Sequence, residues 1–528
     1  MTPGAGNPSP AGRSKPAGMR LASALALSLL ASGLAAAEGP AAPLTLAQAA
    51  RRALAGNLGV GLERLGAADA LDGVTLAESA FDARLSWSNT LGSSRSLADI
   101  DADLPATDTW ASELALSQPF SWGGSLRLSG SADRLWADSD GIAGNRTVQA
   151  GAGIAYTQPL LRGGWRAVNL APVVSARLGA GQSRLLLRAA TLDLLLRAEQ
   201  DYWALAASRS LVALRESSLA SARSLLDEVS ERRRLGTATV QEELQARADV
   251  AAQEVAVLGA RQQADAADIR LRRTLGMDGA DLAELALQPL PEDPVEGVAD
   301  YRAWLARVLE GDLPSRARRL EVDAAEARVG AARMNDLPSL DLTLAGNANG
   351  EPATFGRLNP AMNALPGRHS WDAAASLTLA FPLGFRESES RLRLALRDRR
   401  RAELRVADAR QALTFDARAA WRDLESARAR RESARAGLDL QTRAYEGERA
   451  RYAAGVTDLP RVLQARASLD AAQFAWVSAV LDGRSAAARV ARLDGSILTR
   501  LGFTWDDAEP LLGADLGVDD PLPPLSEP

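Results

Sequence analysis

The hydrophobic positions of this 528-residue chain follow two different periods, and each period predicts a different kind of element. A three-four spacing, typical of one helix face, runs from Leu211 to Val229, and small residues in this stripe would let neighbouring helices approach closely. Proline, which costs roughly 3 kcal/mol inside a helix, is absent from residues 173 to 288 and 383 to 459. The pattern therefore predicts two long helices of about 65 residues. The positions of the stripe are Leu211, Leu214, Ser218, Ala222, Leu225 and Val229.

Other stretches alternate apolar and polar residues, which is the period of a β-strand. Residues 81–88 and 148–157 alternate in the first half of the chain, and SLDLTLAG at 339–346 and WDAAASLTLAF at 371–381 alternate in the second. Strands of about 9 to 11 residues with one apolar face suit a transmembrane barrel, although a soluble sandwich would show the same alternation. Six tryptophans lie in or beside these segments, as interfacial girdles would require. They are Trp87, Trp110, Trp122, Trp136, Trp165 and Trp371.

The chain contains an internal repeat, because its two halves share one order of elements. The pentapeptide LQARA occurs at 244–248 and again at 463–467, Trp203 matches Trp421, and Gly236 matches Gly455. Each half reads as a helix of about 35 residues, a β region, a helix of about 65, a glycine turn and a helix of about 40. At about 1.5 Å per residue, the two shorter helices in series match the long helix, so each half predicts a long packed rod.

The turns between the long helices and the helices that follow them carry capping signals. Gly236 and Gly455 are placed to end the long helices. Thr239 and Glu242 form a T-x-x-E capping box after the first glycine, and Asp458 is placed to cap the second returning helix, with Pro460 early in that helix.

Composition narrows the possible chemistry. The chain is 47% hydrophobic and 24% charged, has a net charge of −5, and contains no cysteine and one histidine. Disulfides, thiolate metal sites and catalytic thiols are therefore excluded, and we read His369 as a loop residue. No phosphate-binding glycine loop or nucleophile–base pairing is present. We expect a non-enzymatic protein without cofactor or metal, and its acidic character argues against nucleic acid as a partner.

Near the N-terminus, Arg20 precedes an apolar run from Leu21 to Leu34 and small residues placed for cleavage, which predicts a secretory signal peptide. The run is shorter than the roughly 20 residues of a spanning helix. Translation could start at Met1 or Met19. At the other end, the acidic, proline-rich segment after Leu501 predicts a disordered tail.

The duplicated plan, together with LTLAQAARRAL, YTQPLLRGGWR, MNDLPSLDLTLAG and RYAAGVTDLPRVLQA, resembles the TolC-type outer-membrane efflux family. The resemblance implies a homotrimer whose strands pool into one barrel among outer-membrane lipids and whose helices form a periplasmic tunnel. It also implies passive conduction and docking onto a periplasmic adaptor (membrane fusion) protein bound to an inner-membrane pump. The implied docking tips are Gly236, Thr237, Gly455, Val456 and Thr457.

The tip departs from the family pattern. The resemblance implies an acidic ring six and nine residues beyond the second glycine, where this chain has Arg461 and Gln464. The matching first-half positions are Glu242 and Gln245. Tyr452 does match a tyrosine that tethers the closed gate in the family. Our hypothesis is a mixed constriction of Glu242 and Arg461, against the simpler interpretation that Arg461 lies on a solvated helix face.

The first β region is longer than the second, so an extra hairpin could lie outside or inside a barrel of about 12 or 18 strands per trimer. The fold class we expect is therefore an α+β membrane protein, with tandem-repeat helical hairpins and antiparallel strands that a trimer pools into a barrel. A periplasmic coiled-coil adaptor or scaffold without a barrel is the alternative; efflux and protein secretion are not distinguished. The expected segments are 1–37 signal peptide, 38–80 short helices, 81–158 strands, 159–288 long helix, tip and return helix, 289–299 linker, 300–338 short helix, 339–382 strands, 383–501 long helix, tip and return helix, and 502–528 tail.

Overall fold

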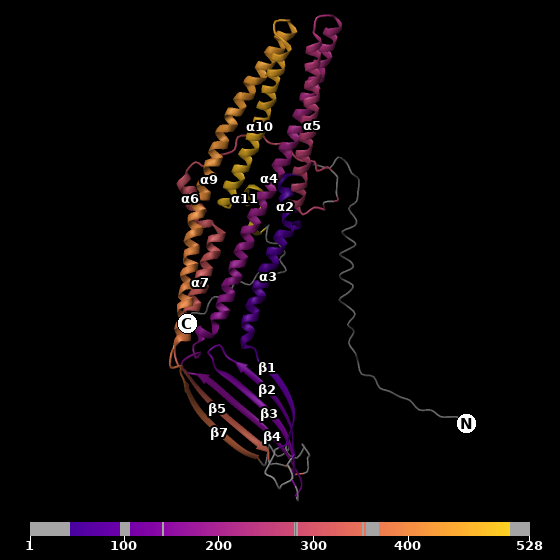
Figure 1. Ribbon diagram of the computed structural model, residues 1–528. Coiled ribbons are helices and arrows are strands. Elements are labelled where there is room, and N and C mark those ends of the chain that lie inside the picture. The colour runs from indigo at the N-terminus through magenta and orange to yellow at the C-terminus, as the bar shows by residue number, and fades with distance from the viewer. Residues whose placement is uncertain are drawn as a thin grey trace, which may run out of the picture.

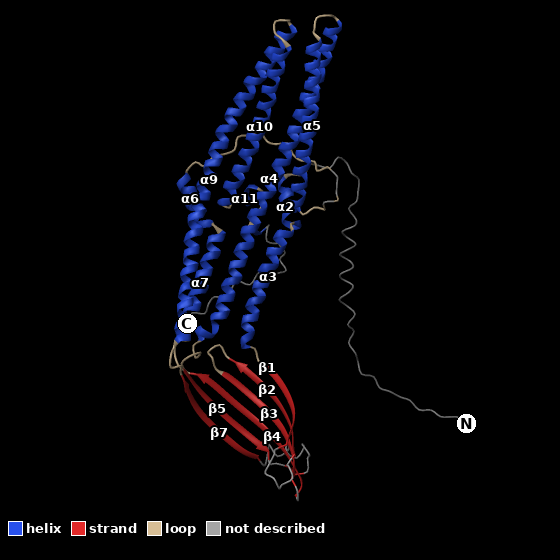
Figure 2. Cartoon of the chain, viewed as in Figure 1, coloured by secondary structure: helices blue, strands red, loops and turns tan. Residues whose placement is uncertain are grey.

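The computed structural model describes residues 43–95, 106–139, 142–278, 280, 284–350, 353–354 and 369–506. The chain is elongated, with helical hairpins at one end and a curved sheet at the other (Figures 1 and 2). The expected signal peptide and most of the expected tail lie outside the described residues. No helix in the described part of the chain combines the length and the apolar character needed to cross a membrane.

Two long helices organise the helical part, as the proline-free segments predicted. They are α4 (Arg166–Arg234) and α9 (Arg386–Ala453). The helices α3 (Leu58–Glu78) and α5 (Val240–Leu275) pack along α4, while α7 (Leu313–Met334) and α10 (Leu459–Leu493) pack along α9. In addition, α10 and α7 contact α4, which joins the two halves side by side. The arrangement of two shorter helices along one long helix is thereby confirmed.

Each expected helix of about 35 residues is instead two helices. In the first half, α2 (Leu46–Gly56) ends at Asn57, and the Asn57 side chain accepts hydrogen bonds from the first amides of α3. In the second half, α6 (Tyr301–Gly311) ends at Asp312, which caps α7 through the amide of Ser315. The prediction of one short helix over 300–338 was therefore wrong, because an Asx residue that caps a new helix cannot also continue the preceding one.

The strands form one antiparallel sheet in the order β1-β2-β3-β4-β5-β7, with the short β6 beside β4. Their bounds are β1 Arg84–Arg95, β2 Ala106–Pro119, β3 Ser125–Ser139, β4 Ile142–Pro159, β5 Ser339–Gly350, β6 Ala353–Thr354 and β7 His369–Ala380. The extra hairpin β2-β3 is thus part of the sheet and does not lie outside it. The interpretation of His369 as a loop residue was wrong, since its backbone pairs with Gly350 at the start of β7.

One face of the sheet is apolar from β1 to β7. Residues that pair directly across antiparallel strands share a face, so the register defines this surface. Trp87 is 70% exposed and Trp371 is 74% exposed, and no second sheet packs on them among the described strands. The opposite face is polar: there Arg127 pairs with Glu113 at 2.7 Å and Asn347 donates to Asp372 at 2.9 Å. The apolar face includes Leu85, Trp87, Leu91, Leu114, Leu116, Leu128, Ile154, Leu344, Trp371, Leu377 and Leu379.

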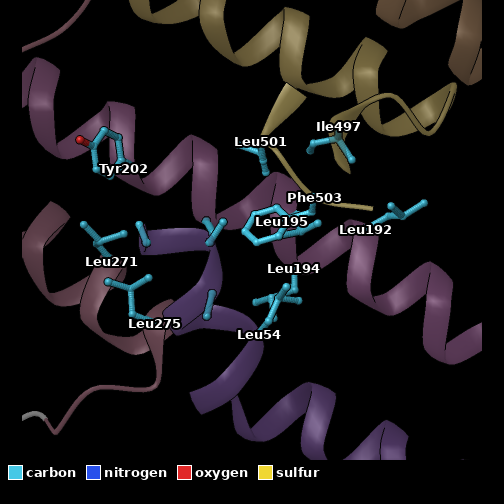
Figure 3. Close-up of a cluster of buried hydrophobic side chains, with 14 of the residues drawn as sticks. Leu54, Leu192, Leu194, Leu195, Tyr202, Leu271, Leu275, Ile497, Leu501 and Phe503 are labelled. Carbon is cyan, nitrogen blue, oxygen red and sulfur yellow. The ribbon is translucent and has the colours of Figure 1, made fainter. Parts of the chain in front are cut away.

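The largest hydrophobic core lies at the middle of the helical part, where α2, α4, α5 and α11 (Ile497–Arg500) meet (Figure 3). Leu195 and Leu271 are fully buried there. The Tyr202 hydroxyl donates to the carbonyl of Leu44 at 2.7 Å and accepts from the amide of Gln288 at 3.1 Å. Burial raises the pKa of Tyr202, and the Gln288 amide partly offsets that rise.

This core also includes the first residues of the expected tail. Phe503 is 2% exposed in the cluster, and Trp505 packs against its edge. Residues 502–506 are therefore part of the folded helical region, because burying two aromatic side chains offsets the entropy of ordering a short segment.

Candidate functional site: the paired helical tips

The two hairpin turns adopt the same backbone conformation. Gly236 and Gly455 have φ angles of +78° and +71°, the left-handed region that glycine tolerates best. The amide of the residue after each glycine donates to a carbonyl five residues earlier: Thr237 to Arg232 and Val456 to Arg451, both at 2.9 Å. This is the Schellman ending of a helix, and it satisfies carbonyls that would otherwise have no partner. Both turns lie at the far end from the sheet (Figure 1).

The residues that start the returning helices differ between the tips. In α5 the Thr239 hydroxyl accepts from the amide of Glu242 at 3.2 Å, and the Glu242 carboxylate accepts from the amide of Thr239 at 2.7 Å. This confirms the predicted capping box. In α10 the side chain of Asp458 makes no capping hydrogen bond, so that part of the prediction was wrong. Asp458 instead lies 3.6 Å from Arg461.

Four of the candidate aperture residues occupy the first two turns of α5 and α10. Glu242 and Gln245 are half-buried, whereas Arg461 and Gln464 are exposed. Glu242 is engaged with Thr239 and Arg461 with Asp458, so Glu242 and Arg461 are not an ion pair within one chain. A mixed constriction of Glu242 and Arg461 would have to form between chains.

Tyr452 joins the two tips. Its side chain is 4% exposed and packs in a cluster with Val229 of α4 and Leu459 of α10. The guanidinium of Arg232, at the end of the other long helix, lies 4.6 Å from the centre of the Tyr452 ring and donates to the Tyr452 carbonyl at 3.3 Å. Burial raises the pKa of Tyr452 and the nearby carboxylate of Glu242 raises it further, while Arg232 opposes the rise.

A buried polar network next to the tips was missed by sequence analysis. Arg466 of α10 is 3% exposed, and its guanidinium bonds to Asp249 of α5 at 3.1 Å. One turn further along α10, Asp470 accepts from Ser218 of α4 at 2.7 Å. The network therefore crosses three helices from both halves of the chain. In the sequence, the one indication of this network was Ser218, a polar residue within an otherwise small and apolar stripe.

Among the described residues, no group of three or more histidine, cysteine, aspartate or glutamate side chains is placed to hold a metal ion. The polar side chains at the tips form hydrogen bonds or ion pairs with helix ends, with one another and with the neighbouring hairpin. Such an arrangement can hold two hairpins together and present two turns to a partner.

The sequence of this chain is similar to those of known proteins. The family model described as outer membrane efflux protein matches residues 125–277 and 304–496, together well over half of the chain. Protein CyaE of Bordetella pertussis (strain Tohama I) is 29% identical over 226 residues, which cover 42% of this chain and 44% of that relative. The chain thus spans less than half the length of this curated relative.

Solved structures share the fold. The outer membrane channel CmeC of Campylobacter jejuni superposes with a TM-score of 0.67 at 16% identity, covering 89% of each chain. The open state of the outer membrane channel MtrE of Neisseria gonorrhoeae gives a TM-score of 0.62 at 16% identity, covering 86% of this chain and 89% of that one. Structures of CusC give 0.67 at 15% identity. The helical hairpins and the antiparallel sheet of the predicted fold class are confirmed, and the chain belongs to the outer membrane efflux protein family.

Proposed function

We propose that three copies of the chain form an outer-membrane channel with a periplasmic helical tunnel. The observation that carries the proposal is the sheet, which has an exposed apolar face and two unpaired edges. Among the described strands, β1 and β7 are each 12 residues long and each pairs on one side only. Long unpaired edges favour pairing with another chain. Because β1 runs away from the helices and β7 runs toward them (Figure 2), β7 of one copy suits antiparallel pairing with β1 of the next.

The dimensions of the apolar face support a membrane position. Trp371 lies near the start of β7 and Phe381 directly follows that strand, ten residues on. Trp110 lies within β2 and Phe120 directly follows that strand, also ten residues on. Ten residues span about 33 Å along a strand, or about 23 Å across a bilayer at a tilt of about 45°. This matches the apolar band of about 25 Å between aromatic girdles in outer-membrane barrels. Three copies with six long strands each would pool 18 strands.

The helical tips are proposed to contact a periplasmic adaptor that is bound to an inner-membrane pump. Supporting this, Gly236 and Gly455 have open space where a side chain would project, and Val456 is 67% exposed at the very end of its hairpin. A partner backbone could therefore approach both turns closely. Substrates would pass through the tunnel passively, whether in efflux or in protein secretion, with energy supplied by the pump.

Engineered disulfides test the shared barrel, since the natural chain contains no cysteine. Thr90 of β1 and Ala374 of β7 occupy the polar face of opposite edges. Thr90→Cys combined with Ala374→Cys, and with each neighbouring same-face register, is expected to give covalent dimers and trimers in outer-membrane extracts. Ser129→Cys in the interior strand β3, combined with Ala374→Cys, is the matched control. Monomers in every edge register would overturn the proposal.

A further inference from the structure

A cavity of about 460 Å³ lies at the junction of helices and sheet, where α4 begins, α7 ends and α9 begins. We name it the junction cavity. Its apolar wall is formed by Val168, Ala171 and Pro172 of α4 and by Ala331 and Ala332 of α7. Small apolar side chains on adjacent helices leave the space open. The cavity is separate from the tips, which lie at the far end of the same helices (Figure 1).

The charge at the junction cavity is unbalanced. Arg162, Arg328 and Arg391 line it, and the single acid in its lining is Glu387. Glu387 already pairs with Arg391 at 2.5 Å. Among the residues that the structure describes, the exposed side chains of Arg162 and Arg328 have neither an ion pair nor a hydrogen bond. Two guanidinium groups therefore line one cavity without compensating charge.

Two further features favour an anion in this cavity. The hydroxyl of Ser175 is buried in its wall and has no hydrogen-bond partner in the described part of the chain. The long helix α4 also begins here, its first turn holds no acidic residue, and Trp165 before it supplies no side-chain cap. The helix α9 begins here as well, but Glu387 and Glu389 in its first turn offset its positive end, so α4 carries this argument. Uncapped helix N-termini carry partial positive charge and free amides, which attract anions.

We propose that the junction cavity binds a phosphate group, either that of a lipid headgroup or that of a soluble phosphate ester. Guanidinium groups bind phosphate through paired hydrogen bonds, and the Ser175 hydroxyl adds a neutral donor. The apolar wall suits the hydrocarbon portion of either ligand. A carboxylate offers two oxygens, whereas a phosphate offers more acceptors to Arg162, Arg328 and Ser175 together.

The position of the cavity suits a lipid. Pro382 lines it directly after Phe381, the aromatic residue at the helix-side end of the apolar face. A headgroup would therefore meet the cavity at the depth where the apolar face ends. This lipid source rests on the proposed membrane position of the sheet, whereas a soluble phosphate ester does not.

The first experiment uses the full chain, purified in detergent and stripped of lipid. Native mass spectrometry would count bound phosphatidylglycerol, with diacylglycerol as the ligand that lacks phosphate. Equilibrium dialysis would measure radiolabelled glycerol 1-phosphate as the soluble ester. The test variant is Arg162→Gln/Arg328→Gln. Arg316→Gln/Arg333→Gln is the matched control, because it removes two exposed α7 arginines that do not line the cavity.

We expect the test variant to weaken binding of one phosphate ligand by at least about tenfold, with the control variant unchanged. Ala331→Phe, which fills the cavity and leaves every charge in place, should give the same loss while its helical circular dichroism is retained. Selective binding of phosphatidylglycerol assigns the lipid source, and binding of glycerol 1-phosphate alone assigns the soluble one. No binding of either ligand, equal binding of diacylglycerol, or equal loss in the control variant would overturn the site. None of these binding results depends on the edge disulfides. The phosphate site and the trimeric barrel can therefore be refuted independently of each other.

Discussion

The two copies of LQARA have the same sequence and different surroundings. Arg247 in the first copy has 63% of its side chain exposed and pairs with Glu243 one turn earlier in its own helix. Arg466, at the same position of the second copy, has 4% of its side chain exposed and pairs with Asp249 of the other half. The difference arises because α10 packs against both α9 and α4, whereas α5 packs mainly along α4. The two repeats therefore share the same helix and turn, while the packing around each copy determines which residues its arginine contacts.

The largest difference is expected from replacing each arginine in turn. Arg466→Met leaves the half-buried Asp249 without its cationic partner, which should cost roughly 1 to 3 kcal/mol of local stability. Arg247→Met removes an exposed arginine, and the buried Glu243 keeps Arg233 as its partner, so the change should cost less than about 1 kcal/mol. Hydrogen exchange of the purified channel would show faster exchange over 240–255 and 459–470 in the first variant only.

A second substitution separates the lost charge pair from lost packing. Adding Asp249→Leu to Arg466→Met removes the unpaired carboxylate, and protection should largely return, because apolar replacement of a buried ion pair is often neutral. If both arginine variants exchange alike, the two LQARA copies are equivalent and the contrast between them fails.

The next effect concerns the residues that begin the returning helices. Leu459 is fully buried in the tip cluster, while Val240, at the same position of the first repeat, is 61% exposed. Leu459→Ala should destabilise the tip by about 2 to 5 kcal/mol, while Val240→Ala should change stability by less than about 0.5 kcal/mol. Limited proteolysis at the two turns would detect the opening. Equal cleavage of the two variants would show that α10 is no more buried than α5.

Sequence analysis identified those features that depend on local pattern. The stripe from Leu211 to Val229 packs as expected, with Ser218, Ala222 and Leu225 buried. The glycine turns and the Thr239 capping box were also foreseen, because each follows from a few neighbouring residues.

The features that sequence analysis missed depend on distant contacts. Nothing within LQARA distinguishes Arg466 from Arg247, since the burial of Arg466 requires helices from both halves. The strand order, likewise, follows from pairings between β4 and β5 that join the two repeats. Asp458 was expected to cap α10, but a short carboxylate can equally pair with a cation one turn away.

That difference in capping predicts a smaller effect. Thr239→Ala removes a hydroxyl that accepts from the amide of Glu242, and it should cost about 1 kcal/mol. Asp458→Ala, the same position of the second repeat, removes no capping bond and should cost less than about 0.5 kcal/mol. Exchange rates of the first-turn amides of α5 and α10 measure both values. An equal loss in the two variants would mean that Asp458 caps α10 in solution.

The smallest effect is expected at Glu242 and Arg461, where the two repeats place opposite charges at matching positions. If these side chains meet between chains at the constriction, Arg461→Ala should shift single-channel ion selectivity toward cations by a factor of about two, because the acid remains without the opposing charge. Glu242→Gln should shift it toward anions. Arg449→Ala, which removes an exposed arginine of α9 that is not among the candidate aperture residues, is the matched control. Unchanged conductance and selectivity in Arg461→Ala would place this residue on a solvated helix face, and the constriction would then have to be set by Tyr452 and the packing around it.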